Sequence, residues 1–205
     1  MARPSQKKER RAELIPLITA VFAARGYRRT TTAQLAAACK VQENTLYRLW
    51  PSKKAMFIAA IEHVFEVSAR IWRDLIAHPG GHDESPAGRI LSYEADHHGE
   101  LGNYRIVFAG LSEADDPAIK HALRRMFSRF HEYLEMHVTS TDPSGANAHA
   151  WALIGLGLVA SVGRELGFLS AADRRDLILS AGTRLIGGLA TPGGAVVVGT
   201  NGKRK

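Results

Sequence analysis

The sequence predicts an all-α protein of about nine helices, in which an N-terminal three-helix head with a helix-turn-helix precedes a C-terminal helical body. Three observations support this fold class. Apolar residues recur at helical spacing along most of the 205 residues. No β-strand pattern of any length precedes the short run at 195–198, which glycines flank. Two short helical segments within residues 30–53 are joined by a tight turn, as in a helix-turn-helix.

The first helix is expected over about residues 7–25, where apolar residues line one face. Pro16 lies inside this span and cannot donate a helix hydrogen bond, so the helix either kinks there or begins its regular part near Pro16. Gly26 follows the last apolar residues and is expected to end the helix in a left-handed conformation.

The second and third helices form the predicted helix-turn-helix. The second begins at Thr31, because Thr31 and Gln34 have the spacing of a capping box, in which each side chain satisfies a free backbone amide of the other residue. Residues 39–41 make the turn, and the third helix covers about 42–49. Pro51 ends it.

The body is expected to contain six further helices, separated by loops rich in glycine, proline or small polar residues. The first of them is long, carries a wide apolar stripe, and connects the head to the body. We expect these helices at about residues 52–77, 87–98, 104–114, 117–138, 146–167 and 171–190.

The composition is that of a globular protein from a reducing compartment. Hydrophobic residues make up 45% of the sequence, and the single cysteine, Cys39, excludes an internal disulfide framework. The polar first residues do not resemble a signal peptide. The most apolar stretch, 151–162, is shorter than the roughly 20 residues that cross a bilayer. We therefore expect a cytoplasmic protein, no membrane partner, and a buried helix at this stretch.

The formal net charge of +7 is concentrated at the N-terminus. Residues 1–55 carry twelve Lys and Arg against three acidic residues, a balance of +9, whereas residues 56–205 have a balance of −2. Cations that neutralise phosphates release condensed counterions, which drives binding to nucleic acid. A solvated basic surface is the alternative, but the coincidence of the charge with the helix pair favours double-stranded DNA as partner.

The first half of the third helix carries side chains that can read bases. A recognition helix lies in the major groove with this half against the base edges. Gln42 and Asn44 can each form two hydrogen bonds with adenine, and Glu43 can accept one from a cytosine amino group. Thr45 can contact a thymine methyl group. Only some such side chains reach a base, so surface positions without DNA contact remain an alternative.

Hydroxyl and cationic side chains around the turn are candidates for contacts with the DNA backbone. Leu46 and Trp50, four residues apart, are expected instead to face the core. The predicted backbone contacts are Thr30, Thr31, Thr32, Tyr47, Arg48 and Lys53.

These motifs together resemble the head of the TetR family of transcriptional repressors. The resemblance covers about 45 residues, and its combination of residues is specific although each motif alone is weak. The matching residues are Phe22, Gly26, Thr30, Thr31, Leu35, Ala36, Val41, Thr45, Leu46, Tyr47, Trp50, Ser52 and Lys53.

Three residues depart from the family pattern. Lys40 stands where Gly is usual, so the turn is reached either without positive φ or with mild strain. Leu49 stands where His is common, which removes one candidate phosphate contact. Glu43 places a negative charge where neutral or basic residues are usual, and it should repel phosphates.

The resemblance implies a homodimeric repressor that binds a palindromic operator and releases it when a small-molecule effector binds the body. The dimer would form through the helices at about 146–167 and 171–190, where repeated glycines independently suggest close helix packing; an ordinary helix pair within one chain is the alternative. We divide the chain into a DNA-binding domain at 1–52, a ligand-binding and dimerisation domain at 53–190, and a flexible tail at 191–205.

The resemblance also implies an effector pocket among the middle helices, with the helix at 52–77 as the lever to the head. Aromatic and apolar residues of these helices are candidates for its lining, although such residues at helical spacing more often belong to the core. The candidates are Phe65, Trp72, Phe108, Met126, Phe130 and Tyr133.

The rival interpretation is a helical-bundle metal-binding protein or enzyme whose basic N-terminus is incidental. Glu94 and His97, with His98 beside them, have the spacing of a ligand pair in di-iron bundles, but a second such pair is missing from the sequence. A serine nucleophile elbow, a P-loop and a dinucleotide fingerprint are also missing. We therefore expect no metal site, no cofactor and no enzymatic activity.

Overall fold

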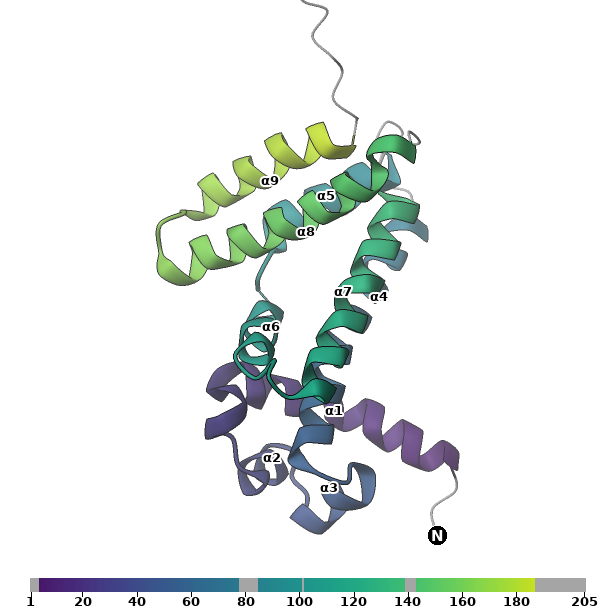
Figure 1. The fold of residues 1–205 in the computed structure, drawn as a ribbon, viewed down its shortest axis with the longest axis vertical. Coiled ribbons are helices and arrows are strands. Elements are labelled where there is room, and N and C mark those ends of the chain that lie inside the picture. The colour runs from purple at the N-terminus through teal and green to yellow at the C-terminus, as the bar shows by residue number, and fades with distance from the viewer. Residues whose placement is uncertain (1–3, 78–84, 101, 139–142, 187–205) are drawn as a thin grey trace, which may run out of the picture.

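The computed structural model describes residues 4–77, 85–100, 102–138 and 143–186. These residues form nine α-helices and no strand, which confirms the predicted all-α fold. The head consists of α1 (Pro4–Arg29), α2 (Thr32–Ala38) and α3 (Glu43–Leu49), which lie together at one end of the molecule (Figure 1).

Helix α1 runs through Pro16 without a break, and its one non-helical residue is Gly26, with φ 73°. Pro16 lies on the exposed face, where the carbonyl of Ala12 that loses its helix partner can bond to water. The kink therefore falls at Gly26, because glycine adopts positive φ without a steric penalty.

Helix α2 begins with the predicted capping box, and the turn that follows α2 contains Lys40. The backbone amide of Thr31 donates to Gln34 Oε1 at 3.0 Å, and the amide of Gln34 donates to Thr31 Oγ1 at 3.2 Å. Lys40 adopts φ 52°, so the chain makes this turn with a non-glycine residue in the left-handed region. The second of the two expected alternatives, mild strain at Lys40, is the one observed.

The body contains six helices. In Figure 1, α4 and α7 run side by side from the head to the far end of the molecule, where α5, α8 and α9 lie, and α6 sits between α1 and α8. The bounds are α4 Lys53–Ala77, α5 Pro86–His97, α6 Asn103–Leu111, α7 Pro117–His137, α8 Pro143–Leu166 and α9 Ala171–Ile186.

One hydrophobic core connects the head to the lower part of the body. It continues from Phe22 of α1 and Leu46 of α3 to Phe57 of α4 and Met126 of α7, all of which are buried. Ion pairs reinforce this junction at its surface, such as Lys54 Nζ with Asp116 Oδ2 at 2.7 Å. The head and the lower part of the body therefore form one continuous packed core.

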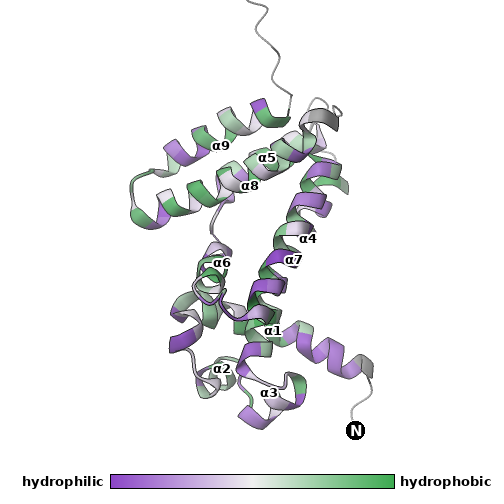
Figure 2. Cartoon of the chain, viewed as in Figure 1, coloured by the Kyte–Doolittle hydropathy of each residue, from purple (hydrophilic) through white to green (hydrophobic). Residues whose placement is uncertain are grey.

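Helix α8 is not the buried helix that we expected. Only 22% of its most apolar window is buried, and of the helices that the structure describes, only its segment 145–166 is long and apolar enough to cross a membrane. Figure 2 shows apolar residues along α8 on the outside of the body. The expected run at 195–198, the tail at 191–205 and the last residues of the helix expected at 171–190 lie outside the described residues.

Candidate nucleic-acid interface and cavity

The outer face of helix α3 is polar and exposed to solvent, whereas its inner face is buried against the rest of the head. Leu46 is fully buried and Trp50 is 4% exposed, which confirms that both hold the helix to the core. The residues of this segment that were predicted to contact DNA lie on the opposite side. Gln42, Glu43, Asn44, Tyr47 and Arg48 are exposed, and Thr45 is partly exposed.

Hydrogen bonds across the turn fix some of these side chains. Thr32 Oγ1 of α2 donates to Glu43 Oε2 at 2.5 Å, and Tyr47 Oη donates to Thr32 Oγ1 at 3.4 Å. Within α3, an Arg48 guanidinium nitrogen donates to Thr45 Oγ1 at 3.3 Å. The exposed face therefore has a pre-organised arrangement of hydroxyl, carboxylate and guanidinium groups.

Two residues of the predicted DNA-binding set have other partners. Thr30 is 1% exposed and its hydroxyl donates to the carbonyl of Gly26 at 2.7 Å, so its side chain is a structural one. The ammonium of Lys53 donates to the carbonyls of Tyr27 and Thr30 at 3.1 and 3.0 Å and lies 4.5 Å from the centre of the Tyr27 ring. These contacts could not be predicted from sequence spacing, because they depend on the path of the chain after the kink at Gly26.

Arg11 helps to hold α3 in position, a role that was not predicted from the sequence. Its Nε donates at 2.9 Å to the carbonyl of Leu49, at the C-terminal end of α3, and its guanidinium lies 5.6 Å from the Trp50 ring centre. A cation at this end of a helix satisfies a free carbonyl and complements the helix dipole. Arg11 thus positions α3 from the far side of the head.

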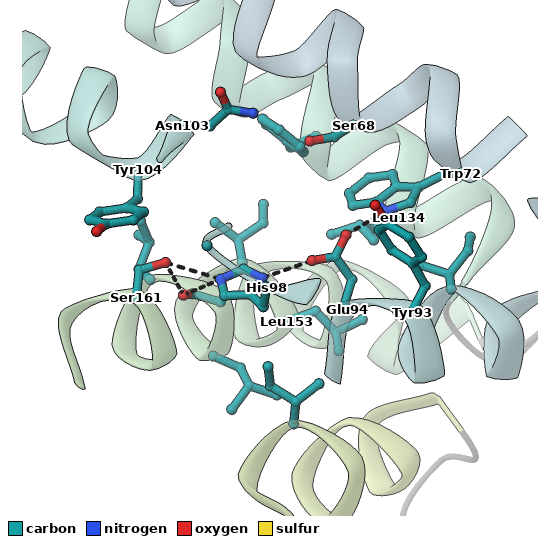
Figure 3. A pocket seen from close by; sticks show the side chains of 18 of the residues that line it. Ser68, Trp72, Tyr93, Glu94, His98, Asn103, Tyr104, Leu134, Leu153 and Ser161 are labelled. Atoms are coloured by element: carbon teal, nitrogen blue, oxygen red, sulfur yellow. Dashed lines mark hydrogen bonds and ion pairs between the residues drawn. The ribbon is translucent and has the colours of Figure 1, made fainter. Parts of the chain in front are cut away.

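The body encloses a cavity of about 240 Å³ to which α4, α5, α6, α7, α8 and α9 all contribute side chains (Figure 3). Trp72, Met126 and Phe130, three of the six predicted lining residues, do line it. The lining is mainly apolar, with a small number of polar groups on α5, α6 and α8, as is usual for small-molecule sites.

The other three predicted lining residues lie elsewhere. Phe65 is buried against Phe130, with ring centres 5.1 Å apart, and so belongs to the core between α4 and α7. Phe108 is 40% exposed on α6. Tyr133 packs against Trp72 from outside the lining, with ring centres 5.3 Å apart. Helical periodicity does not distinguish the cavity side of such a helix from its core side.

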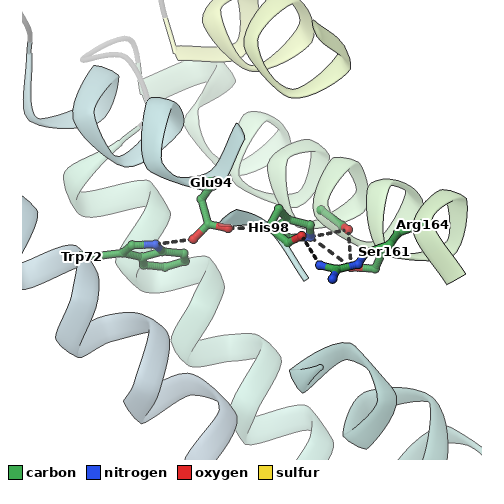
Figure 4. Close-up of polar contacts among 6 residues, drawn as sticks. Trp72, Glu94, His98, Ser161 and Arg164 are labelled. Atoms are coloured by element: carbon green, nitrogen blue, oxygen red, sulfur yellow. Dashed lines mark hydrogen bonds and ion pairs between the residues drawn. The ribbon is translucent and has the colours of Figure 1, made fainter. Parts of the chain in front are cut away.

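A chain of hydrogen bonds crosses the cavity wall (Figure 4). Trp72 Nε1 donates to Glu94 Oε1 at 2.7 Å, and Glu94 Oε2 lies 2.7 Å from His98 Nδ1. His98 Nε2 lies 2.8 Å from the carbonyl of Gly157 and 3.0 Å from Ser161 Oγ. This network joins α4, α5 and α8. Glu94 and His98 are four residues apart, a spacing at which two side chains on one helix face can bond to each other. From the sequence, however, they were considered only as metal ligands.

Both nitrogens of His98 face acceptors, which favours the imidazolium form. Burial lowers the pKa of His98, but the hydrogen bond and negative charge of Glu94, with the carbonyl of Gly157, outweigh burial and raise the pKa overall. The positive charge of Arg164 opposes this rise. The geometry and the direction of the pKa shift both favour an ion pair between Glu94 and His98 in the cavity wall.

The suggested metal ligands do not come together. Glu94 bonds to His98, while His97 pairs with Glu100 at 3.2 Å near the surface. Among the described residues, no group of three or more His, Cys, Asp or Glu side chains is placed to hold a metal ion.

The fold resembles those of solved transcriptional regulators. The TetR-family regulator from Cytophaga hutchinsonii matches with a TM-score of 0.69 and 15% identity, over 91% of this chain and 98% of that chain. The TetR-family regulator from Agrobacterium tumefaciens gives 0.66 and 12%, over 88% and 99%. A regulator from Saccharomonospora viridis, solved in complex with choline, gives 0.65 and 16%, over 84% and 95%. At these identities the likeness concerns the fold alone.

Higher sequence identity is found over a shorter stretch. The nucleoid occlusion factor SlmA of Haemophilus influenzae (strain PittGG) is 48% identical over 58 residues, which are 28% of this chain and 27% of that protein. SlmA of Pasteurella multocida (strain Pm70) is 43% identical over 58 residues, 28% of this chain and 29% of that protein. The matched stretch is thus about a quarter of the length of these relatives.

Two short helices joined by a tight turn, with an exposed polar face on the second, are the features of a helix-turn-helix, and here they stand on an all-helical body. Residues 17–60 match the family described as bacterial regulatory proteins, tetR family. The N-terminal part of the chain thus matches the TetR family in sequence, and most of the chain shares the fold of solved TetR-family regulators.

Proposed function

We propose that the protein is a dimeric, effector-responsive transcriptional repressor that binds a palindromic DNA operator through α3. The observation that carries the proposal is the exposed polar face of α3, held on buried Leu46 and Trp50 within a region that matches the tetR family. The basic N-terminal region supplies sequence-independent attraction to phosphates. Such a protein acts in the cytoplasm, where the DNA is accessible to it.

Eight of the ten predicted side chains remain candidates for contact with DNA, since Thr30 and Lys53 are occupied within the head. In this proposal, residues at the start of α3 read bases, and residues around the turn between α2 and α3 contact phosphates. The candidates are Thr31, Thr32, Gln42, Glu43, Asn44, Thr45, Tyr47 and Arg48. The DNA-binding region would then end near residue 52, where α3 is complete.

The open face of α8, with α9 beside it, is the proposed dimer interface. Val159 and Leu166 are 53% and 72% exposed on this helix, and a side chain added at Gly155 would meet open space. By contrast, a Cβ at Gly182 of α9 would lie 2.3 Å from Leu91 of the same chain, so close packing within one chain explains that glycine. Exposed apolar surface of this extent supports contact with a second copy.

The cavity is the proposed effector site. An effector acts by binding better to the conformation in which the two heads are wrongly spaced for the operator, so that the population shifts away from DNA. Both α4 and α7 line the cavity and also pack in the core shared with the head, which supports them as the elements that move.

The test is to sequence the DNA that the purified full-length protein selects from a random pool. A palindromic consensus, with affinity that falls as salt rises, is expected. Equal and weak binding to all sequences would overturn the proposal. Elemental analysis of the same sample, if it found stoichiometric iron or manganese, would instead favour a metal-binding protein.

A further inference from the structure

We propose that the cavity selects an organic cation: a molecule with an alkyl or aryl body and one amine or quaternary ammonium group, bound beside Glu94 and the aromatic rings around it. The inference rests on the proposed function only in taking the cavity as the effector site. It specifies the chemical class of effector, which neither the fold nor the family match determines.

The charges that line the cavity disfavour an anion. The lining residues within the described part of the chain include two carboxylates, those of Glu94 and Glu100, and no Lys or Arg. Of the two histidines in the lining, His98 already directs both of its nitrogens at protein acceptors, and His97 pairs with Glu100. A ligand carboxylate or phosphate would therefore lie close to these two carboxylates without a free donor of positive charge.

The carboxylate of Glu94 retains capacity for a further partner. Its side chain is 24% exposed, and each of its oxygens accepts one hydrogen bond, from Trp72 and from His98. A carboxylate oxygen can accept two, so a ligand donor or an ammonium group can approach without displacing either partner. Figure 3 shows Glu94 between Trp72 and Tyr93, facing the cavity.

Aromatic rings line the same cavity as this carboxylate. Trp72, Tyr93, Tyr104, Phe127 and Phe130 all line the cavity. The faces of such rings attract ammonium groups, and most strongly where water is excluded. Burial raises the pKa of the Tyr93 hydroxyl, and the negative charges of Glu94 and Glu100 raise it further, which agrees with a negative potential at this end.

The size of the cavity limits the ligand. A volume of about 240 Å³ is just below the range of about 300–1,000 Å³ typical of small-molecule sites, so a ligand with a single unbranched hydrocarbon chain suits it. Ligands with one polar end and an apolar chain match a lining in which polar groups on α5, α6 and α8 lie beside apolar side chains of α4 and α7.

Binding of a cation should also compete with the proton on His98. Glu94 of α5 stabilises that proton, Arg164 of α8 opposes it, and the paired His97 and Glu100 lie at the rim of the same site. A second positive charge near Glu94 weakens the hold on the proton, so a cation should bind more tightly as the pH rises from 6 to 8. A neutral ligand of equal length should show no such trend.

The experiment is calorimetric titration of the full-length protein with octyltrimethylammonium, octanoate and 1-octanol at pH 6 and pH 8. We expect the cation to bind at least tenfold more tightly than octanoate or octanol at pH 8. The Glu94→Gln variant should lose this preference while its affinity for octanol stays within twofold. The matched control is Glu132→Gln, which removes an exposed carboxylate of α7 outside the cavity lining and should keep the preference.

Tightest binding of octanoate, equal binding of all three probes, or binding of none would overturn the cation proposal. Binding to the DNA selected from the random pool then tests the proposed function separately from the cation proposal. If the cation binds with the expected preference but fails to release the selected DNA, the class of ligand stands and effector-controlled repression fails. If DNA binding is specific but the probes show no preference for the cation, the proposed DNA-binding function stands and the cation proposal fails.

Discussion

The hydroxyl of Thr32, at the start of α2, donates to the carboxylate of Glu43, at the start of α3, over 2.5 Å. This bond crosses the turn of the helix-turn-helix and holds a negative charge at the end of α3 that is predicted to meet base edges. Because both side chains are accessible at the surface of the head, the charge faces the proposed DNA partner rather than the core.

Replacing Glu43 with Gln should therefore raise affinity for non-cognate DNA. Loss of one repulsive surface charge is worth about 0.5–1 kcal/mol, so we expect a roughly two- to fivefold gain on random duplexes at low salt. A competition assay with a non-cognate competitor measures this. Thr32→Val is the matched control, because it removes the hydrogen bond but keeps the charge, and it should produce no such gain. Unchanged competition by Glu43→Gln would contradict the prediction.

Replacing Lys40 with Gly should stabilise the protein. Lys40 is held at φ 52°, where a side chain costs roughly 1–2 kcal/mol and glycine fits without that cost. Since glycine also loses more backbone entropy on folding, we expect a net gain of about 0.5–1 kcal/mol in the free energy of unfolding, measured with urea. Lys40→Ala removes the same charge but keeps the strain, so a gain of equal size in that variant would disprove the explanation.

The head could be predicted from the sequence because its signals are local. Capping at Thr31 and Gln34 depends on residues close in the chain, and so does the burial of Leu46 and Trp50. The engagement of Lys53 was missed because it depends on carbonyls more than twenty residues away, exposed by the kink at Gly26.

The cavity could be predicted only in part, because its form depends on how distant helices pack. Trp72 and Phe130 could be suggested from their apolar stripes, but the same reasoning included Phe65, which faces the core. Glu94 and His98 acquire their role only when Gly157 of α8 comes within hydrogen-bonding distance of the imidazole. Nothing in the local sequence indicates that contact.

Replacing Val159 with Asp should dissociate the proposed dimer. Val159 is 53% exposed on the open face of α8, and burying an unpaired carboxylate there costs several kcal/mol. We expect the dimer dissociation constant to rise by about 100-fold or more, as measured by sedimentation equilibrium. Affinity for a palindromic site should fall with it, because two linked heads bind more tightly than one.

The control for this variant is Met136→Asp. Met136 is 75% exposed on α7, outside the proposed interface, so an added charge there should leave the assembly unchanged. Equal dissociation by both variants would point to a general loss of folding. A dimer that survives Val159→Asp would place the interface elsewhere.

The ion pair of His98 and Glu94 should make stability depend on pH in a definite direction. The pKa of His98 is raised in the folded protein, so the folded state binds its proton more tightly than the unfolded state does. This contribution is complete below the ordinary pKa of histidine, about 6.5, and is lost as the pH rises through the higher pKa of the folded protein. His63, whose pKa is lowered mainly by burial, changes stability with pH in the opposite direction.

The quantity to measure is therefore the difference in unfolding free energy between the wild type and His98→Gln, by urea titration from pH 5.5 to 8.5. That difference should shrink as the pH rises. If it stays constant or grows, the imidazole is neutral in the folded protein and the network is held by hydrogen bonds without a net charge.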